Sequence, residues 1–162
     1  SYDIPAGTLR AFGGGGGDVT MSDSFHVVGP ADGTPLEFTA QLVLLGSATR
    51  TLCQFGGAGV NGRLLEGSSN AADTIVTAPP CGTRNLNTTL EVQVHRLSGE
   101  RFQISASVGA GGYEGGSEYI NGTLRFAGLP EGASVVSCNG FYQGPPVPVA
   151  RGSWGELKTR YR

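Results

Sequence analysis

Few side chains in this sequence could serve as catalytic acids, bases or nucleophiles, and they lie far apart. The two histidines, His26 and His95, stand alone in stretches that alternate like strands, so we interpret both as solvated residues on polar faces. The sequence contains no Gly-x-Ser-x-Gly motif and no plausible Ser/His/Asp set. We therefore expect no catalytic residues and no enzyme activity.

Carboxylates are the next group that could carry chemistry. Glu114 and Glu118 flank a glycine-rich turn, and Asp18, Asp23 and Asp32 lie near other turns. Calcium needs several such oxygens at one loop, and the twelve-residue calcium-loop pattern is absent. Zinc is disfavoured because no CxxC pair exists and neither histidine lies near a cysteine. We expect no bound metal and no cofactor.

The three cysteines allow one disulfide and leave one thiol over. Cys53 and Cys81 both lie in turn-rich sequence, and we predict that they form the bridge, with Cys81–Cys138 as the alternative. In the chain-entropy model, closing a loop of that size stabilises the fold by about 3 kcal/mol. We interpret Cys138 as a small buried hydrophobic residue.

Aromatic side chains on an outward face would suggest a sugar-binding surface, because sugar rings stack on them in many β-sandwich modules. The candidates are Tyr113, Tyr119, Phe141 and Tyr142, of which Tyr119 is expected to point outward. Ordinary cross-strand packing is the alternative explanation.

The elements that position these residues read as strands. Over residues 88–108, hydrophobic and polar residues alternate on both sides of a short glycine-containing connection, which predicts an antiparallel hairpin. Similar alternation at 19–27, 36–44 and 120–126, with shorter segments between, gives eight or nine strands and no amphipathic helix among them. We predict an all-β fold over 18–144, a single two-layer antiparallel β-sandwich of jelly-roll or immunoglobulin-like kind.

Length and composition limit the classes of protein to which this chain can belong. A chain of 162 residues suits one domain with a real core. The net charge of −2 argues against nucleic acid as a partner, and no apolar run approaches the roughly 20 residues of a membrane span. The chain begins at Ser1 without methionine, as an exported mature protein would, so we expect a secreted, extracellular or cell-surface protein.

Both ends of the chain differ from the middle. Residues 1–12 form a short β segment, followed by a hinge of five glycines at 13–17. A phosphate-binding loop would need a helix directly after such glycines, whereas residues 18–21 read as strand. Residues 145–162 begin with a proline-rich spacer and end in a segment whose capping box and apolar stripe predict a short helix. Such a helix is too short to persist alone, so we expect a docking tail.

Four segments of the sequence together carry a resemblance to other proteins: residues 24–30, 122–130, 137–141 and 154–162. They resemble uncharacterised secreted β-sandwich proteins of environmental bacteria. The resemblance implies export and a β-sandwich, and it brings no known catalytic or binding residues.

The two tethered ends lead to a functional hypothesis. We predict a secreted structural protein, the subunit of an extracellular filament or polymer in which the N-terminal segment adds a strand to the next copy of the same chain. The alternative is a monomeric extracellular carbohydrate-binding module, with polysaccharide as its partner. The residues expected at the assembly interface are Ile4, Leu9, Ala11, Phe12, Trp154, Leu157 and Tyr161.

Overall fold

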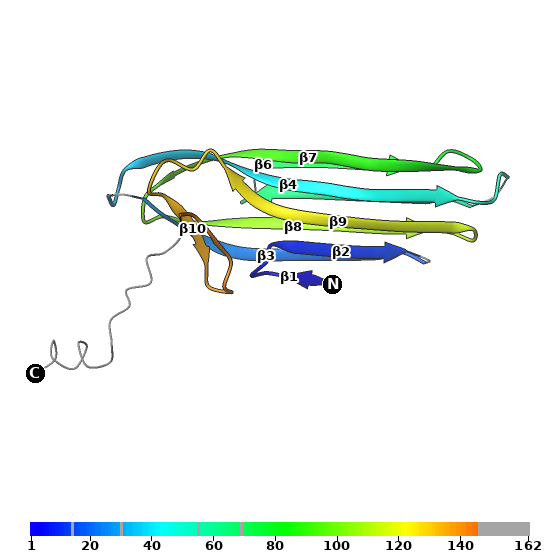
Figure 1. Ribbon diagram of the computed structural model, residues 1–162, viewed down its shortest axis with the longest axis horizontal. Coiled ribbons are helices and arrows are strands. Elements are labelled where there is room, and N and C mark those ends of the chain that lie inside the picture. Colours follow the sequence, from blue (N-terminus) through cyan, green and yellow to red (C-terminus); the bar gives the residue numbers. More distant parts are fainter. Residues whose placement is uncertain (14, 30, 55, 69, 146–162) are drawn as a thin grey trace, which may run out of the picture.

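A computed structural model describes residues 1–13, 15–29, 31–54, 56–68 and 70–145. This part of the chain forms eleven strands and no helix, arranged as two antiparallel sheets packed face to face (Figure 1). The predicted all-β sandwich is confirmed, with more strands than the eight or nine expected. The expected docking tail, with Trp154, Leu157 and Tyr161, lies outside the described residues.

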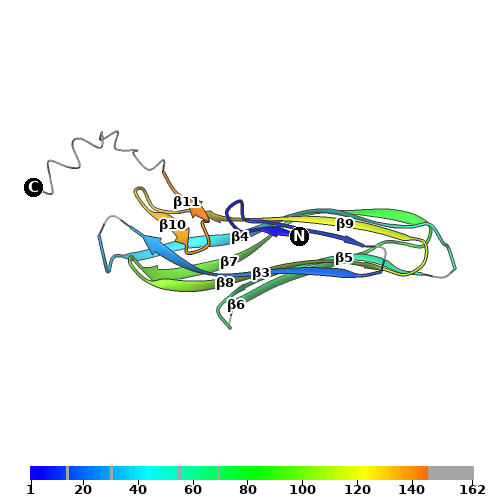
Figure 2. The ribbon, with the colours of Figure 1, turned by 90° about the horizontal axis from the view of Figure 1, so that it is seen from below.

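The first sheet has five strands and the second has six. In spatial order the first sheet contains β1 (Tyr2–Asp3), β2 (Thr8–Gly13), β9 (Gly116–Ala127), β4 (Pro35–Arg50) and β7 (Gly82–Leu97). The second contains β11 (Tyr142–Gln143), β10 (Ser134–Ser137), β3 (Gly17–Val28), β8 (Arg101–Gly112), β5 (Ala58–Glu66) and β6 (Asn70–Thr77). Figure 2 shows the layers from the side, with β9 and β4 in one and β3 and β8 in the other.

The pairing of eight strands is nested. β2 pairs with β9, β3 with β8, β4 with β7 and β5 with β6, as though one long hairpin had been rolled into a two-layer sandwich. This is the jelly-roll order, so the jelly roll is the observed one of the two sandwich types expected.

The predicted hairpin over residues 88–108 is wrong. β7 belongs to the first sheet and β8 to the second, so the turn at Gly99 crosses from one layer to the other. Alternation of hydrophobic and polar residues has the same period in both arrangements, because each strand buries one face whichever sheet it joins. The pattern therefore finds the strands without assigning them to a sheet.

The two ends of the sandwich are filled differently. Five phenylalanines pack at the end where β4 begins, with ring centroids 5.4–5.9 Å apart: Phe25, Phe38, Phe102, Phe126 and Phe141. Burial of each such side chain stabilises the fold by about 1.5–3 kcal/mol. The opposite end, at the right of Figure 1, is lined by alanine and glycine. We call it the narrow end, because the side chains that line it are small. The connection between β2 and β3 lies there.

Candidate functional site

The N-terminal strand β2 is built into the first sheet. It pairs with β9 over six positions, from Thr8 opposite Thr123 to Gly13 opposite Glu118. Leu9 and Ala11 point inward and are buried, at 0% and 3% exposure. Alternation along the strand thus inserts two apolar side chains into the core while β9 holds the backbone.

The remaining N-terminal residues of the expected assembly interface lie around this docked strand. Ile4 is partly buried and packs against the core, whereas Phe12 points outward and is 68% exposed. β1 folds back on β2, and the Ser1 ammonium donates a hydrogen bond to the carbonyl oxygen of Arg10 at 2.7 Å. The N-terminal residues therefore contact their own sandwich in this structure.

The link from β2 to β3 makes little contact with the rest of the protein. Gly13 ends β2 in the first sheet, and Gly17 begins β3 in the second. Gly15 and Gly16 are exposed, with nothing within 4 Å of where a Cβ would stand, and Gly16 has a φ of +92°. Glycine adopts such a conformation freely, so Gly15 and Gly16 can change backbone conformation at low cost.

Glu118 is buried beneath the end of β2, although the sequence suggested a turn-flanking carboxylate. The residue is 3% exposed, and neither carboxyl oxygen has a hydrogen-bond partner among the described residues. The carboxyl group packs against Gly13, Gly112 and Gly116, where an added Cβ would overlap its oxygens. Burial raises the pKa of Glu118 above its usual value of 4.5.

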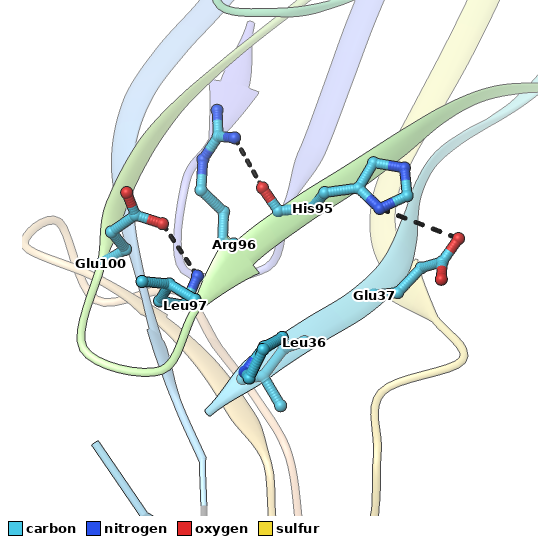
Figure 3. A pocket seen from close by; sticks show the side chains of 7 residues that line it. Leu36, Glu37, His95, Arg96, Leu97 and Glu100 are labelled. Carbon is cyan, nitrogen blue, oxygen red and sulfur yellow. Dashed lines mark hydrogen bonds and ion pairs between the residues drawn. The ribbon is translucent and has the colours of Figure 1, made fainter. Parts of the chain in front are cut away.

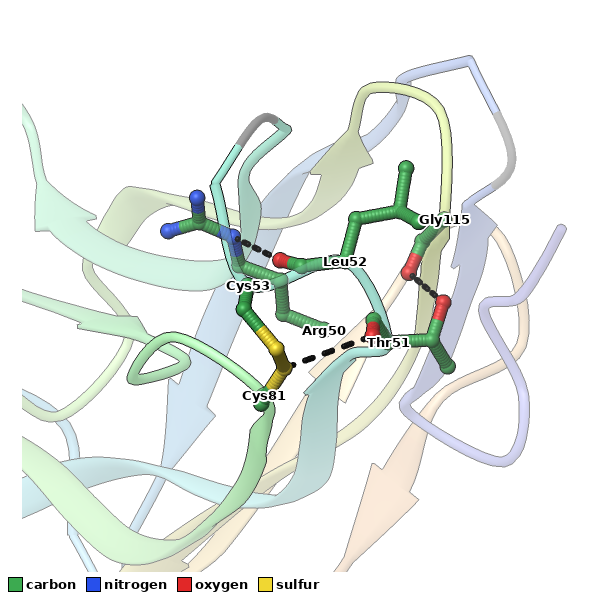
Figure 4. Close-up of a disulfide and its surroundings, with 6 residues drawn as sticks. All are labelled: Arg50, Thr51, Leu52, Cys53, Cys81 and Gly115. Carbon is green, nitrogen blue, oxygen red and sulfur yellow. Dashed lines mark hydrogen bonds between the residues drawn. A yellow bond between two sulfur atoms is a disulfide. The ribbon is translucent and has the colours of Figure 1, made fainter.

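The predicted disulfide between Cys53 and Cys81 is present at the same end of the sandwich (Figure 4). It joins the segment after β4 to the segment before β7, with Sγ of Cys81 lying 3.5 Å from the carbonyl oxygen of Thr51. Both the backbone N–H and the hydroxyl of Thr51 donate to the carbonyl oxygen of Gly115 at 2.8 Å. The bridge therefore fastens the β4–β5 segment to the β6–β7 segment, and the Thr51 hydrogen bonds fasten the β4–β5 segment to the β8–β9 turn.

Cys138 is not the buried hydrophobic residue that the sequence suggested. It is an exposed free thiol in the turn between β10 and β11. Hydrophobic neighbours in sequence misled the interpretation, since Cys138 lies just past the end of a four-residue strand. Its neighbour Asn139 donates a side-chain hydrogen bond to Oδ1 of Asp23 at 2.8 Å, and Asp23 points inward and is 6% exposed.

A hollow of about 360 Å³ lies at the phenylalanine end, between the start of β4 and the end of β7 (Figure 3). His95 and Glu37 form an exposed cross-strand pair there, with 3.8 Å between Nδ1 and the carboxylate. Arg96 donates to the carbonyl oxygen of His95 at 2.7 Å and forms an ion pair with Glu66. These groups are engaged with neighbours or open to water.

The structure does not bring the candidate sugar-stacking residues onto one face. Tyr113 lies in the β8–β9 turn and is 81% exposed, while Tyr119 is 46% exposed on the outer face of the first sheet, where it is the register partner of Phe12. Tyr142 is 42% exposed on β11, and its hydroxyl bonds to the carbonyl of Pro145. Phe141 is a core residue and not a stacking candidate.

Comparison of the chain with protein-family models, with curated proteins and with solved structures gave no match, so the geometry of the chain itself carries the functional argument. Among the described residues, no three His, Cys, Asp or Glu side chains are grouped so as to hold a metal ion. The same part of the chain contains no helix with the length and apolarity that a membrane crossing requires.

Proposed function

We propose that the protein is a secreted structural subunit that assembles into an extracellular filament or polymer by passing its N-terminal strand to the next copy. The observation that supports this proposal is that β2 is firmly docked but loosely connected. The strand is held by main-chain pairing and by the buried Leu9 and Ala11, yet it is joined to β3 through exposed glycines.

Strand exchange conserves the contacts that the structure displays. Every copy offers the same groove beside β9. β2 of one copy therefore forms the same backbone pairs with β9 of another copy as it does with β9 of its own sandwich. Glycines in the connection permit the backbone change that such an exchange needs. If the exchange is not reciprocal, each copy gives one strand and receives one, and the contact continues into a filament instead of closing.

Secretion belongs to the same proposal. Disulfides such as Cys53–Cys81 form and persist in oxidising compartments, which supports an extracellular location. The connection at Gly15 and Gly16 has the composition of a flexible linker.

The test is the size of the native, untagged protein, measured by light scattering and negative-stain imaging at rising concentration. We expect filaments or large oligomers that disappear when residues 1–12 are deleted. A synthetic peptide of residues 1–12 should bind the truncated protein and restore its stability without restoring polymers. A 16.6 kDa monomer at every concentration contradicts the proposal.

A further inference from the structure

The outer face of the second sheet carries a hollow of about 700 Å³ at its narrow end. β3, β8, β5 and β6 supply its floor and the β8–β9 turn supplies one wall. We call this hollow the glycine trough. The residues that matter for its chemistry are Asp18, Asn61, Ile75, Gly111 and Tyr113.

Two polar side chains of the lining, Asp18 and Asn61, converge over one glycine of β8. Asp18 on β3 and Asn61 on β5 are both register partners of Gly109 on β8. A Cβ on Gly109 would overlap Oδ1 of both side chains, so each leans over the bare backbone between them. No hydrogen bond ties either side chain to another described residue. A carboxylate and an amide placed together accept and donate hydrogen bonds to neighbouring hydroxyl groups of a ligand.

Packing does not explain why the next row of the floor is also glycine. A Cβ on Gly111 would touch only the Cα of Gly16 at 3.8 Å, and a Cβ on Gly59 would meet its nearest atom at 3.4 Å, both ordinary contacts. Glycine in a strand costs about 0.5–1 kcal/mol relative to alanine. Glycine in a strand also marks places where a ligand approaches the backbone closely. The bare floor therefore suits a flat ligand lying against the sheet.

The walls of the trough carry two exposed apolar side chains beside the polar Arg50 and Thr77. Ile75 on β6 is 74% exposed, and Tyr113 in the β8–β9 turn is 81% exposed. An aromatic ring offers a large apolar face at low conformational cost, and its hydroxyl remains available to water or ligand. A site with few convergent polar groups and apolar walls matches a ligand that has both hydroxyl groups and C–H faces.

We propose that the glycine trough binds an uncharged polysaccharide. Asp18 and Asn61 hydrogen-bond to hydroxyl groups on adjacent carbons of one sugar ring, and Tyr113 stacks on the C–H face of a neighbouring ring. The two charged residues of the lining, Asp18 and Arg50, have opposite signs, so the trough has no net charge that favours an anionic chain. The floor lies on the second sheet, and Gly16 and Gly17 of the connection to β2 border it. Sugar binding is therefore measured beside the size of the assembly, so that failure of one proposal is distinguished from failure of the other.

The experiment measures binding of the whole protein to soluble neutral polysaccharides: hydroxyethyl cellulose, xylan, galactomannan, laminarin and dextran, with polygalacturonate as the anionic comparison. Asp18→Ala and Tyr113→Ala remove the two kinds of contact. Gly111→Thr fills the floor, and because a Cβ fits there it should leave the melting temperature unchanged or higher. Tyr119→Ala is the matched control, an exposed tyrosine on the other sheet.

We expect binding to at least one neutral polysaccharide, weakened at least tenfold by each trough substitution and unchanged in Tyr119→Ala. Absence of binding to all five neutral polysaccharides overturns the proposal. So does binding that survives the trough substitutions, or binding that only Tyr119→Ala removes. Melting temperatures of all variants show that the loss comes from the site and not from unfolding.

Discussion

Gly13, the last residue of β2, is the register partner of Glu118, and Oε2 of Glu118 occupies the space that a side chain at position 13 would need. The buried, unpaired carboxyl group therefore lies directly under the point where the N-terminal strand leaves the first sheet. We therefore expect its ionisation to affect the docking of that strand.

We expect Glu118 to make the fold less stable as pH rises. Burial raises the pKa of Glu118 in the folded protein, so the folded state holds this proton more tightly than the unfolded chain does. Its contribution is fully present below the unfolded pKa, near 4.5, and is lost as pH rises toward the folded value. Glu118→Gln removes the titration. The difference between the urea-unfolding free energies of the two proteins should change in favour of the variant between pH 4 and 8. A constant difference would show that Glu118 has the same pKa in both states.

Leu9 and Phe12 provide a matched pair on the same strand. Leu9 is fully buried, so Leu9→Ala should cost about 2–5 kcal/mol of unfolding free energy. Phe12 is 68% exposed, and Phe12→Ala should change stability by less than about 0.5 kcal/mol. Chemical denaturation of both variants measures the contrast. Equal losses would mean that β2 is not docked with Leu9 inward.

Removal of the disulfide should weaken the narrow end of the sandwich. The bridge closes a sequence separation of 28 residues, and replacing Cys53 and Cys81 by serine should cost about 2–4 kcal/mol. Thermal unfolding with and without reductant checks this, because reductant should destabilise only the unsubstituted protein. A melting temperature insensitive to reductant would argue that the bridge adds no stability.

Cys138 should react while the protein is folded. Its thiol is exposed and unpaired, so Ellman's reagent should titrate one thiol per chain without denaturant. Cys138→Ser should abolish the reaction and leave stability within about 0.5 kcal/mol of the original. Titration of no thiol would contradict the exposure of Cys138, and titration of three would contradict the pairing of Cys53 with Cys81.

Sequence patterns predicted the sandwich, because burial on one face leaves a period of two in each strand. They could not assign β7 and β8 to different sheets, since both arrangements bury alternate residues. The Cys53–Cys81 bridge was predicted because both cysteines lie in turn-rich sequence.

The trough could not be read from the sequence. Asp18 and Asn61 are distant in the chain, and only the register of three strands brings them together over Gly109. The one sign of the trough in the sequence was the run of glycines near the end of β8. From the sequence we interpreted that run as a turn. Glu118 was misplaced for a related reason, because its burial depends on glycines from β2 and β8 that offer it space.

The most direct test of strand exchange is a covalent trap between β2 and β9. Arg10 and Asn121 are register partners, and the backbone of Arg10 hydrogen-bonds to Ser1 on the opposite side, which makes the pair a non-hydrogen-bonded one. Such pairs bring Cα atoms to about 4.5 Å, a separation that a disulfide can bridge. Arg10→Cys with Asn121→Cys, in a Cys138→Ser background, should oxidise without distorting the sheet.

A non-reducing denaturing gel of the assembled, oxidised protein then reports which copy holds β2. Exchange between copies should give a ladder of covalent multimers that collapses to monomer on reduction, and Arg10→Cys alone should give no ladder. A single monomer band with both new thiols consumed would show that β2 stays in its own sandwich and would contradict assembly by strand exchange.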